Sequence, residues 1–147
     1  MSGSLYTTDI LRLAVSIPHL GTLDQPQSVV EKRSPVCGSR VTVMLDVDDR
    51  GCVSRFAQDV KACALGQASA ALLGQHVVGA SLSKLETAHE QLSKWLAGER
   101  ADPPDWPGLE IFAAAIPHSA RHAAIRLPFE ATVEAMRQAV SVQVHAA

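Results

Sequence analysis

The sequence predicts an α+β fold, with a small antiparallel sheet of about three strands packed against several helices that cover one face. Two observations point to this class. Residues 40–47 alternate apolar and polar side chains, which is the period of a half-buried strand. The segments on either side of residues 40–60 carry apolar residues at helical spacing or are rich in alanine and leucine. At 147 residues the chain can bury a real core, and we expect residues 1–147 to form one domain.

The N-terminal segment is expected to contain a helix, a loop and a short strand. Its apolar residues recur at helical spacing: Tyr6, Ile10, Leu13, Ala14 and Ile17. This helix should stop before Pro18. Residues 18–27 contain two prolines and a glycine, which indicates a loop. Residues 28–33, SVVEKR, are expected to form a short strand.

Residues 40–60 predict a β-hairpin. The buried face of its first strand should carry Val41, Val43, Leu45 and Val47. The stretch DDRG indicates a turn in which Gly51 takes a positive φ. Residues 52–60 then return as the second strand. Because an isolated hairpin is marginally stable, it needs a further strand and helical cover.

Two helices are expected after the hairpin. The first should run from about Cys63 and end with Gly74 as its C-cap. The second should begin at a capping box formed by SKLE, residues 83–86, and end at Gly98. Its apolar stripe comprises Leu82, Leu85, Leu92, Trp95 and Leu96.

The remainder of the chain is expected to be a loop followed by helix. Residues 98–108 contain three prolines and predict a loop, and residues 109–115 predict a short helix. The last helix should run from Ala120 to about Val142. Pro128 should kink or restart it, because proline cannot donate a backbone hydrogen bond.

The composition argues against several classes of function. The net charge is −2 and there is no basic stripe, so nucleic-acid binding has little support. No apolar run approaches the ~18 residues that a membrane-spanning helix needs, and the first residues lack the pattern of a signal peptide. Three cysteines do not make a disulfide framework. We therefore expect a cytoplasmic protein with reduced thiols.

Cys37 and Cys63 are the candidate functional residues. Cys37 precedes the first hairpin strand and Cys63 follows the second, so we expect their Cα atoms within about 7 Å of each other at one end of the sheet. Cys63 also opens a helix, where the free N–H groups favour a thiolate. Such a pair could hold a soft metal or accept sulfur. The alternative is that these cysteines act as small buried apolar residues, which is the interpretation that suits Cys52.

Four stretches resemble, in order and spacing, the U-type iron–sulfur cluster assembly scaffold family (the IscU, SufU and NifU N-terminal proteins). They are CGS at residues 37–39, CALGQASA at residues 63–70, the opening at residues 5–23, and the insertion at residues 98–123. The QASA sequence and the insertion are most similar to the SufU branch. The resemblance covers nearly the whole chain and implies a SufE/NifU-like fold.

The chain departs from the family at the positions of the family's metal ligands. The aspartate after Cys-Gly is Ser39, and the glycine before the second cysteine is Ala62. The third cysteine is Ala124, and the histidine that precedes it in IscU members is Ala123. His122 is a candidate replacement ligand, with a surface histidine as the alternative.

The resemblance implies a weakly bound iron–sulfur cluster, or a zinc or iron ion, held by Cys37 and Cys63 with His122 as a candidate metal ligand. It implies a scaffold or carrier rather than an enzyme, with a cysteine desulfurase and recipient apoproteins as partners. Two chains in a homodimer could supply two thiolates each. Two alternatives stay open: a zinc-assisted acceptor of sulfur from the desulfurase, and a partner-binding module that no longer binds metal.

Overall fold

The chain folds as the predicted α+β structure. The computed structural model describes residues 5–35 and 38–146. A three-stranded antiparallel sheet has the order β1-β2-β3. The elements are α1 (Thr8–Ala14), β1 (Ser28–Arg33), β2 (Arg40–Val47), β3 (Val53–Lys61), α2 (Ala64–His76), α3 (Leu82–Leu96), the 3-10 helices η1 (Leu109–Ala115) and η2 (Ser119–Arg121), and α4 (His122–Ala146).

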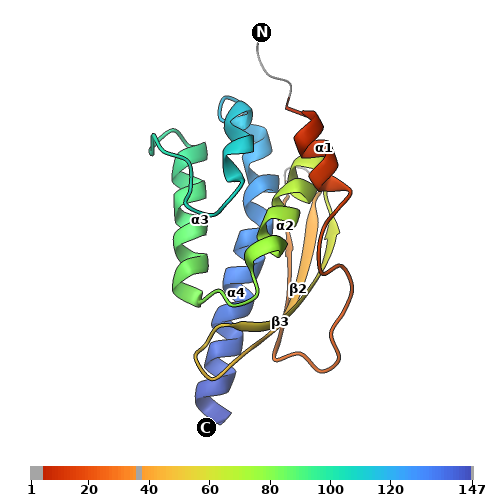
Figure 1. Cartoon of the computed structure of the whole chain (residues 1–147), viewed down its shortest axis with the longest axis vertical. Helices are drawn as coiled ribbons and strands as arrows, with labels where there is room; N and C mark the ends of the chain where they lie inside the picture. Colours follow the sequence, from red (N-terminus) through yellow and green to blue (C-terminus); the bar gives the residue numbers. More distant parts are fainter. Residues whose placement is uncertain (1–4, 36–37, 147) are drawn as a thin grey trace.

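Helix α4 is the centre of the packing. It contacts β1 and β2 along one side and α2 and α3 on others, and it runs the length of the molecule between α3 and the sheet (Figure 1). Within the part of the chain that the structure describes, no helix has the length and apolar character needed to cross a membrane.

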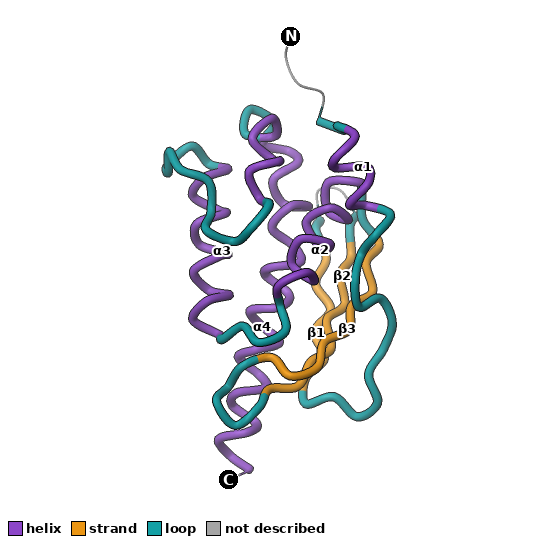
Figure 2. The backbone as a smooth tube through the Cα atoms, in the orientation of Figure 1, coloured by secondary structure: helices purple, strands orange, loops and turns teal. Residues whose placement is uncertain are grey.

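The predicted hairpin is confirmed. The three strands lie side by side (Figure 2), and β2 alternates buried and half-buried residues along its whole length. The buried residues are those expected: Val41, Val43, Leu45 and Val47. The turn also forms as predicted, because Gly51 has a φ of +79° and the Asp48 carboxylate accepts hydrogen bonds from the backbone N–H groups of Arg50 and Cys52 at 2.9 and 3.0 Å.

The outer edge of β3 is covered by the loop that follows α1. The N–H of Gln58 donates to the carbonyl of His19 at 2.9 Å, and the N–H of Gly21 donates to the carbonyl of Gln58 at 3.1 Å. These bonds satisfy part of a strand edge that would otherwise be open to pairing with another chain.

Two predicted helix boundaries are wrong. Helix α2 continues past Gly74 to His76. Gly74 is not a C-cap but lets Pro18 and Gln58 pack closely against the helix, since a Cβ there would lie 3.0 Å from each. Helix α3 is capped by Ser81, whose hydroxyl accepts from the N–H of Lys84 at 3.1 Å, and not by a capping box starting at Ser83. The glutamate of the expected box, Glu86, instead pairs with Arg137 of α4 at 2.7 Å.

Helix α4 continues through Pro128 without a restart. The Ala124 carbonyl, which would accept from residue 128, faces Gly66 in the first turn of α2, and side chains bond to two neighbouring carbonyls. The buried hydroxyl of Ser69 in α2 donates to the Ile125 carbonyl at 2.6 Å, and the hydroxyl of Thr132 donates to the Pro128 carbonyl at 2.8 Å. Packing between α2 and α4 therefore outweighs the helix-breaking tendency of one proline.

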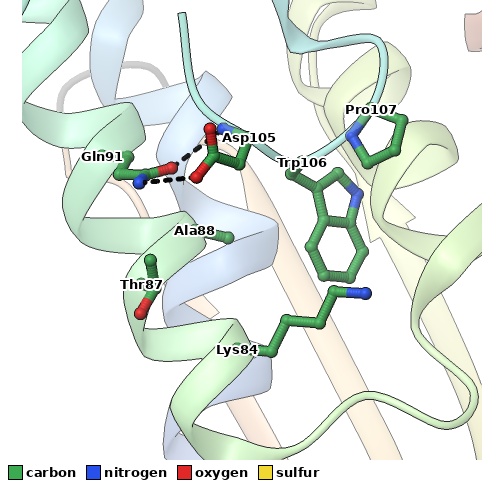
Figure 3. Close-up of a pocket in the computed structure, with 7 residues that line it drawn as sticks. All are labelled: Lys84, Thr87, Ala88, Gln91, Asp105, Trp106 and Pro107. Atoms are coloured by element: carbon green, nitrogen blue, oxygen red, sulfur yellow. Dashed lines mark hydrogen bonds between the residues drawn. The ribbon is translucent and has the colours of Figure 1, made fainter.

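The proline-rich loop before η1 is fixed on α3. Gln91 and Asp105 exchange two hydrogen bonds, and Lys84 lies over the indole ring of Trp106 at 5.6 Å from its centroid (Figure 3). The indole N–H donates to the carbonyl of Leu72 at 2.9 Å. This loop is thus packed against both α3 and α2.

Candidate functional site

Cys63 lies between the end of β3 and the start of α2. It is the N-cap residue of this helix, with φ −65° and ψ 170°, and its side chain is half-buried and makes no capping hydrogen bond. Its carbonyl accepts from the N–H of Gln67 at 2.9 Å, which closes the first helical turn. The thiol therefore stands beside the free N–H groups of a helix start, a position that stabilises anions.

Cys37 lies outside the described residues, so its predicted distance from Cys63 stays a prediction. The residues that flank it are described. The N–H of Ser34 donates to the carbonyl of Ser39 at 2.8 Å, and the N–H of Gly38 donates to the carbonyl of Ser34 at 2.9 Å. Arg40 pairs with Lys61 across the sheet. The connection from residue 34 to residue 39 thus closes at the end of the sheet where α2 begins.

Ala124 lies at the same end of the molecule. A Cβ placed on Gly66, in the first turn of α2, would be 3.2 Å from the Ala124 carbonyl oxygen and 3.7 Å from the Ala124 Cβ. It would also be 2.8 Å from the Cβ of Ala62. The position that the family resemblance assigns to a third thiolate therefore lies one turn from Cys63, but it carries a methyl group that is 2% exposed.

Ser39 is also buried, and its carbonyl closes the 34–39 connection. A serine hydroxyl in this position is a weaker ligand than the carboxylate expected by analogy with the family, because hard and soft metal ions alike prefer an anionic donor to a neutral hydroxyl. The structure therefore brings Ser39, Cys63 and Ala124 to one end of the fold, of which Cys63 alone carries a strong metal ligand.

His122 opens α4 and is buried. Its Nε2 lies 2.8 Å from the Ala115 carbonyl oxygen and 3.1 Å from that of Ile116. Both partners only accept hydrogen bonds, so Nε2 carries the proton, and the ring joins the end of η1 to α4. A metal could be bound through Nδ1 alone, and the role of His122 as a ligand stays a proposal.

Cys52 is far from this site. It lies at the turn of the hairpin and forms an isolated bridge with Ser81. Strand β3, which separates it from Cys63, has nine residues, or roughly 25–30 Å at about 3.3 Å per residue. Within residues 5–35 and 38–146, no group of three or more His, Cys, Asp or Glu side chains is placed to hold a metal ion.

A pocket of about 270 Å³ lies beside the candidate site, and the sequence analysis did not predict it. Its polar lining residues are Arg33, Ser34, Arg126 and Glu130, and Ala123 also lines it. The spacing of Arg126 and Glu130 is a sequence signal for a helical ion pair. The proximity of Ser34 to these residues is not visible in the sequence, because some 90 residues separate them.

Comparison with known proteins identifies the family. The model of the NifU-like N-terminal domain matches residues 5–124, a range that includes Cys63 and Ala124. The iron–sulfur cluster assembly scaffold protein IscU of Thermotoga maritima is 30% identical over 98 residues, which cover 67% of this chain and 68% of that relative.

Two crystal structures show the same fold. The N-terminal part of a nitrogen-fixing NifU-like protein from Brucella abortus superimposes with a TM-score of 0.88 at 34% identity, covering 93% of this chain and 95% of that one. A protein described as a candidate iron–sulfur cluster assembly scaffold for the SUF system, from Fervidobacterium islandicum AW-1, gives 0.81 at 18% identity, with 90% and 96% covered. The family recognised from the sequence is confirmed, whereas the placement in the SufU branch stays a prediction.

Proposed function

The chain belongs to the NifU-like N-terminal domain family, and from this premise we propose that it is an iron–sulfur cluster assembly scaffold or carrier. The observation that carries the proposal is the position of Cys63. This residue is the N-cap of α2, at the end of the sheet where the chain from Cys37 enters β2. A cluster assembled there is cargo that the protein receives and passes on.

The chain supplies two of the ligands that a cluster needs. Iron–sulfur clusters are normally held by four thiolates. Cys37 and Cys63 provide two, and Cys52 is too distant to join them. His122 can add a third ligand through Nδ1, and the others come from a second copy of the chain or from small thiols. Such a site binds its cargo weakly, because open positions allow water and competing ligands to exchange with the cluster.

The proposed partners follow from this role. A cysteine desulfurase supplies sulfur, and recipient apoproteins take the finished cluster. The Cys63 side chain at the N-cap of α2 is only half-buried, so it is accessible for both exchanges. The protein itself needs no acid–base chemistry for this function.

The experiment is cluster assembly driven by a desulfurase. The protein is incubated without oxygen with ferrous iron, L-cysteine and a cysteine desulfurase, and visible absorption is followed before and after an apoprotein acceptor is added. We expect a chromophore that depends on the scaffold and transfers to the acceptor. The Cys52→Ser variant, altered outside the site, is the matched control. Absence of a scaffold-dependent chromophore would overturn the proposal.

A second function, a partner-binding module without metal, is favoured by the burial of Ala124 and Ser39 in place of ligands. In this case the same experiment would give no chromophore, while the protein would still bind the desulfurase in a sedimentation or calorimetric assay. Cluster assembly and desulfurase binding, measured together, therefore separate the two proposals.

A further inference from the structure

The pocket between β1 and α4 contains polar groups whose hydrogen-bonding capacity is not used. Ser34, at the end of β1, is 2% exposed, and its hydroxyl has no hydrogen-bond partner. The Nε atom of Arg126 is likewise buried without a partner. Buried polar groups are almost always paired, so these two groups in one pocket are available to a bound ligand or to water.

The charges of the pocket are mixed. Arg126 Nε and Glu130 Oε1 are 3.7 Å apart, too far for a hydrogen bond, and the same carboxylate oxygen lies 3.9 Å from Nε2 of His89. Arg33 stands at the rim and pairs loosely with Glu31 at 3.5 Å. The pocket therefore offers a guanidinium and a hydroxyl that can donate, and a carboxylate that can accept.

This combination complements a zwitterion. A guanidinium with an adjacent hydroxyl matches a carboxylate, and a carboxylate a few ångströms away matches an ammonium group. A volume of about 270 Å³ lies just below the range of about 300–1,000 Å³ for ligand pockets, which fits a molecule the size of an amino acid or a very short peptide.

The position of the pocket narrows the chemical class of the ligand that it could bind. Ala123 lines it, and the next residue, Ala124, occupies the place where the family resemblance puts a thiolate. Pro35 also lines the pocket and precedes Cys37 by two residues. The pocket is thus lined by residues next in sequence to the candidate site, while the buried Ala124 side chain packs against Gly66 of α2.

We propose that this pocket binds a small aminothiol with a free α-amino acid group, whose thiolate supplies a cluster ligand that Ala124 does not. The carboxylate binds Arg126 and the Ser34 hydroxyl, and the ammonium group faces Glu130. On coordination the thiol loses its proton to solvent and the sulfur donates an electron pair to iron, without any change in oxidation state. The inference rests on the proposed scaffold function for its purpose, but the binding step does not require a cluster.

The test is calorimetric titration of the cluster-free protein under reducing, oxygen-free conditions with L-cysteine, reduced glutathione and 2-mercaptoethanol. We expect saturable binding of a thiol with an α-amino acid group and none of 2-mercaptoethanol. Preference for L-cysteine identifies the free amino acid as the source, and preference for glutathione identifies a γ-glutamyl peptide. Failure of both to bind, or equal binding of 2-mercaptoethanol, would overturn the inference.

Variants locate the binding site. Arg126→Gln should weaken binding by about tenfold or more, because a charge-assisted hydrogen bond is lost. Ser34→Ala should weaken it less. Arg137→Gln alters another arginine of α4 that lies outside the pocket and is the matched control. Unchanged affinity in a folded Arg126→Gln protein would contradict the inference. If the aminothiol binds but no cluster assembles with any thiol, the scaffold proposal fails and the pocket assignment stands.

Discussion

Gly66 packs closely against Ala124, because a Cβ on Gly66 would lie only 3.2 Å from the Ala124 carbonyl oxygen. The carbonyl is available for this approach because Pro128, four residues further along α4, has no N–H to donate to it. The contact fixes the start of α4 against the first turn of α2. It therefore sets the distance between Cys63 and the position that Ala124 occupies.

Gly66→Ala should destabilise the protein. The added methyl group would lie 2.8 Å from the Cβ of Ala62, closer than real contacts allow, and 3.2 Å from the Ala124 carbonyl oxygen, so both the chain before α2 and the start of α4 must shift. Overpacking of this kind costs typically about 1–3 kcal/mol, and the higher helix propensity of alanine offsets about 1 kcal/mol. We expect a net loss of about 1 kcal/mol in the free energy of unfolding, measured with urea. Gln75→Ala, on the exposed part of the same helix, should change it by less than about 0.5 kcal/mol. An unchanged or higher stability for Gly66→Ala would contradict the packing.

Restoring two family ligands should restore metal affinity. The variant Ala124→Cys with Ser39→Asp adds a thiolate and a carboxylate at the end of the fold that holds Cys63. We expect the affinity for zinc to rise by about tenfold or more. This is a small change compared with the binding free energy of about 10–16 kcal/mol that complete structural zinc sites reach. Competition with a chromophoric chelator measures the change.

The control for this variant is Ala97→Cys, which adds a thiol at an exposed position after α3. If the double variant binds zinc no more tightly than the parent or the control, the interpretation of the site as an incomplete ligand set is wrong. If the parent retains stoichiometric zinc through chelator washes, a ligand has been missed. His122→Ala is then the first variant to test, with Nδ1 as the candidate donor.

Glu130 should make stability depend on pH in the acid range. Contact with His89 is the main cause that holds the pKa of Glu130 below its ordinary 4.5, and the charges of His89, Arg126 and Lys32 add to it against the opposing effect of burial. Because the folded-state pKa is lowered, the stabilisation is present above about 4.5 and is lost as the pH falls through the folded value. The contribution should stay below about 1 kcal/mol, since the pairs are partly exposed.

The measurement is the difference in free energy of unfolding between the parent and Glu130→Gln at several pH values from 6 to 3. We expect the difference to shrink as the pH falls. It should also shrink at about 1 M salt, where the screening length is near 3 Å. A difference that is constant across this pH range would show that the ionised carboxylate of Glu130 does not contribute.

The sheet and the helices could be predicted from the sequence because their signals are local. The alternation from Val41 to Val47 and the turn at Gly51 depend on neighbouring residues alone. The prediction of Gly74 as a helix C-cap is wrong because the role of this glycine depends on Pro18, a residue 56 positions earlier. The sequence favours Ser83 over Ser81 as the cap because a glutamate follows Ser83 at the spacing of a capping box, but in the fold this glutamate binds Arg137.

The candidate site could be predicted only in part. The positions of Cys63 and Ala124 at one end of the fold follow from the hairpin and from the family resemblance. The pocket formed by Ser34, Arg126 and Glu130 could not be predicted, since it exists only where the end of β1 meets α4. The same is true of the hydrogen bonds that His122 makes to the end of η1.

The iron and sulfide content of the three cysteine variants tests the central claim most directly. Parent protein, Cys37→Ser, Cys63→Ser and Cys52→Ser are reconstituted chemically without oxygen in the presence of excess cysteine, and iron and sulfide per chain are measured after desalting. The account predicts equal iron and sulfide in the parent and Cys52→Ser, and loss of both in Cys37→Ser and Cys63→Ser. Retention of the parent's iron and sulfide in both of those variants would contradict the assignment of the cluster to Cys37 and Cys63.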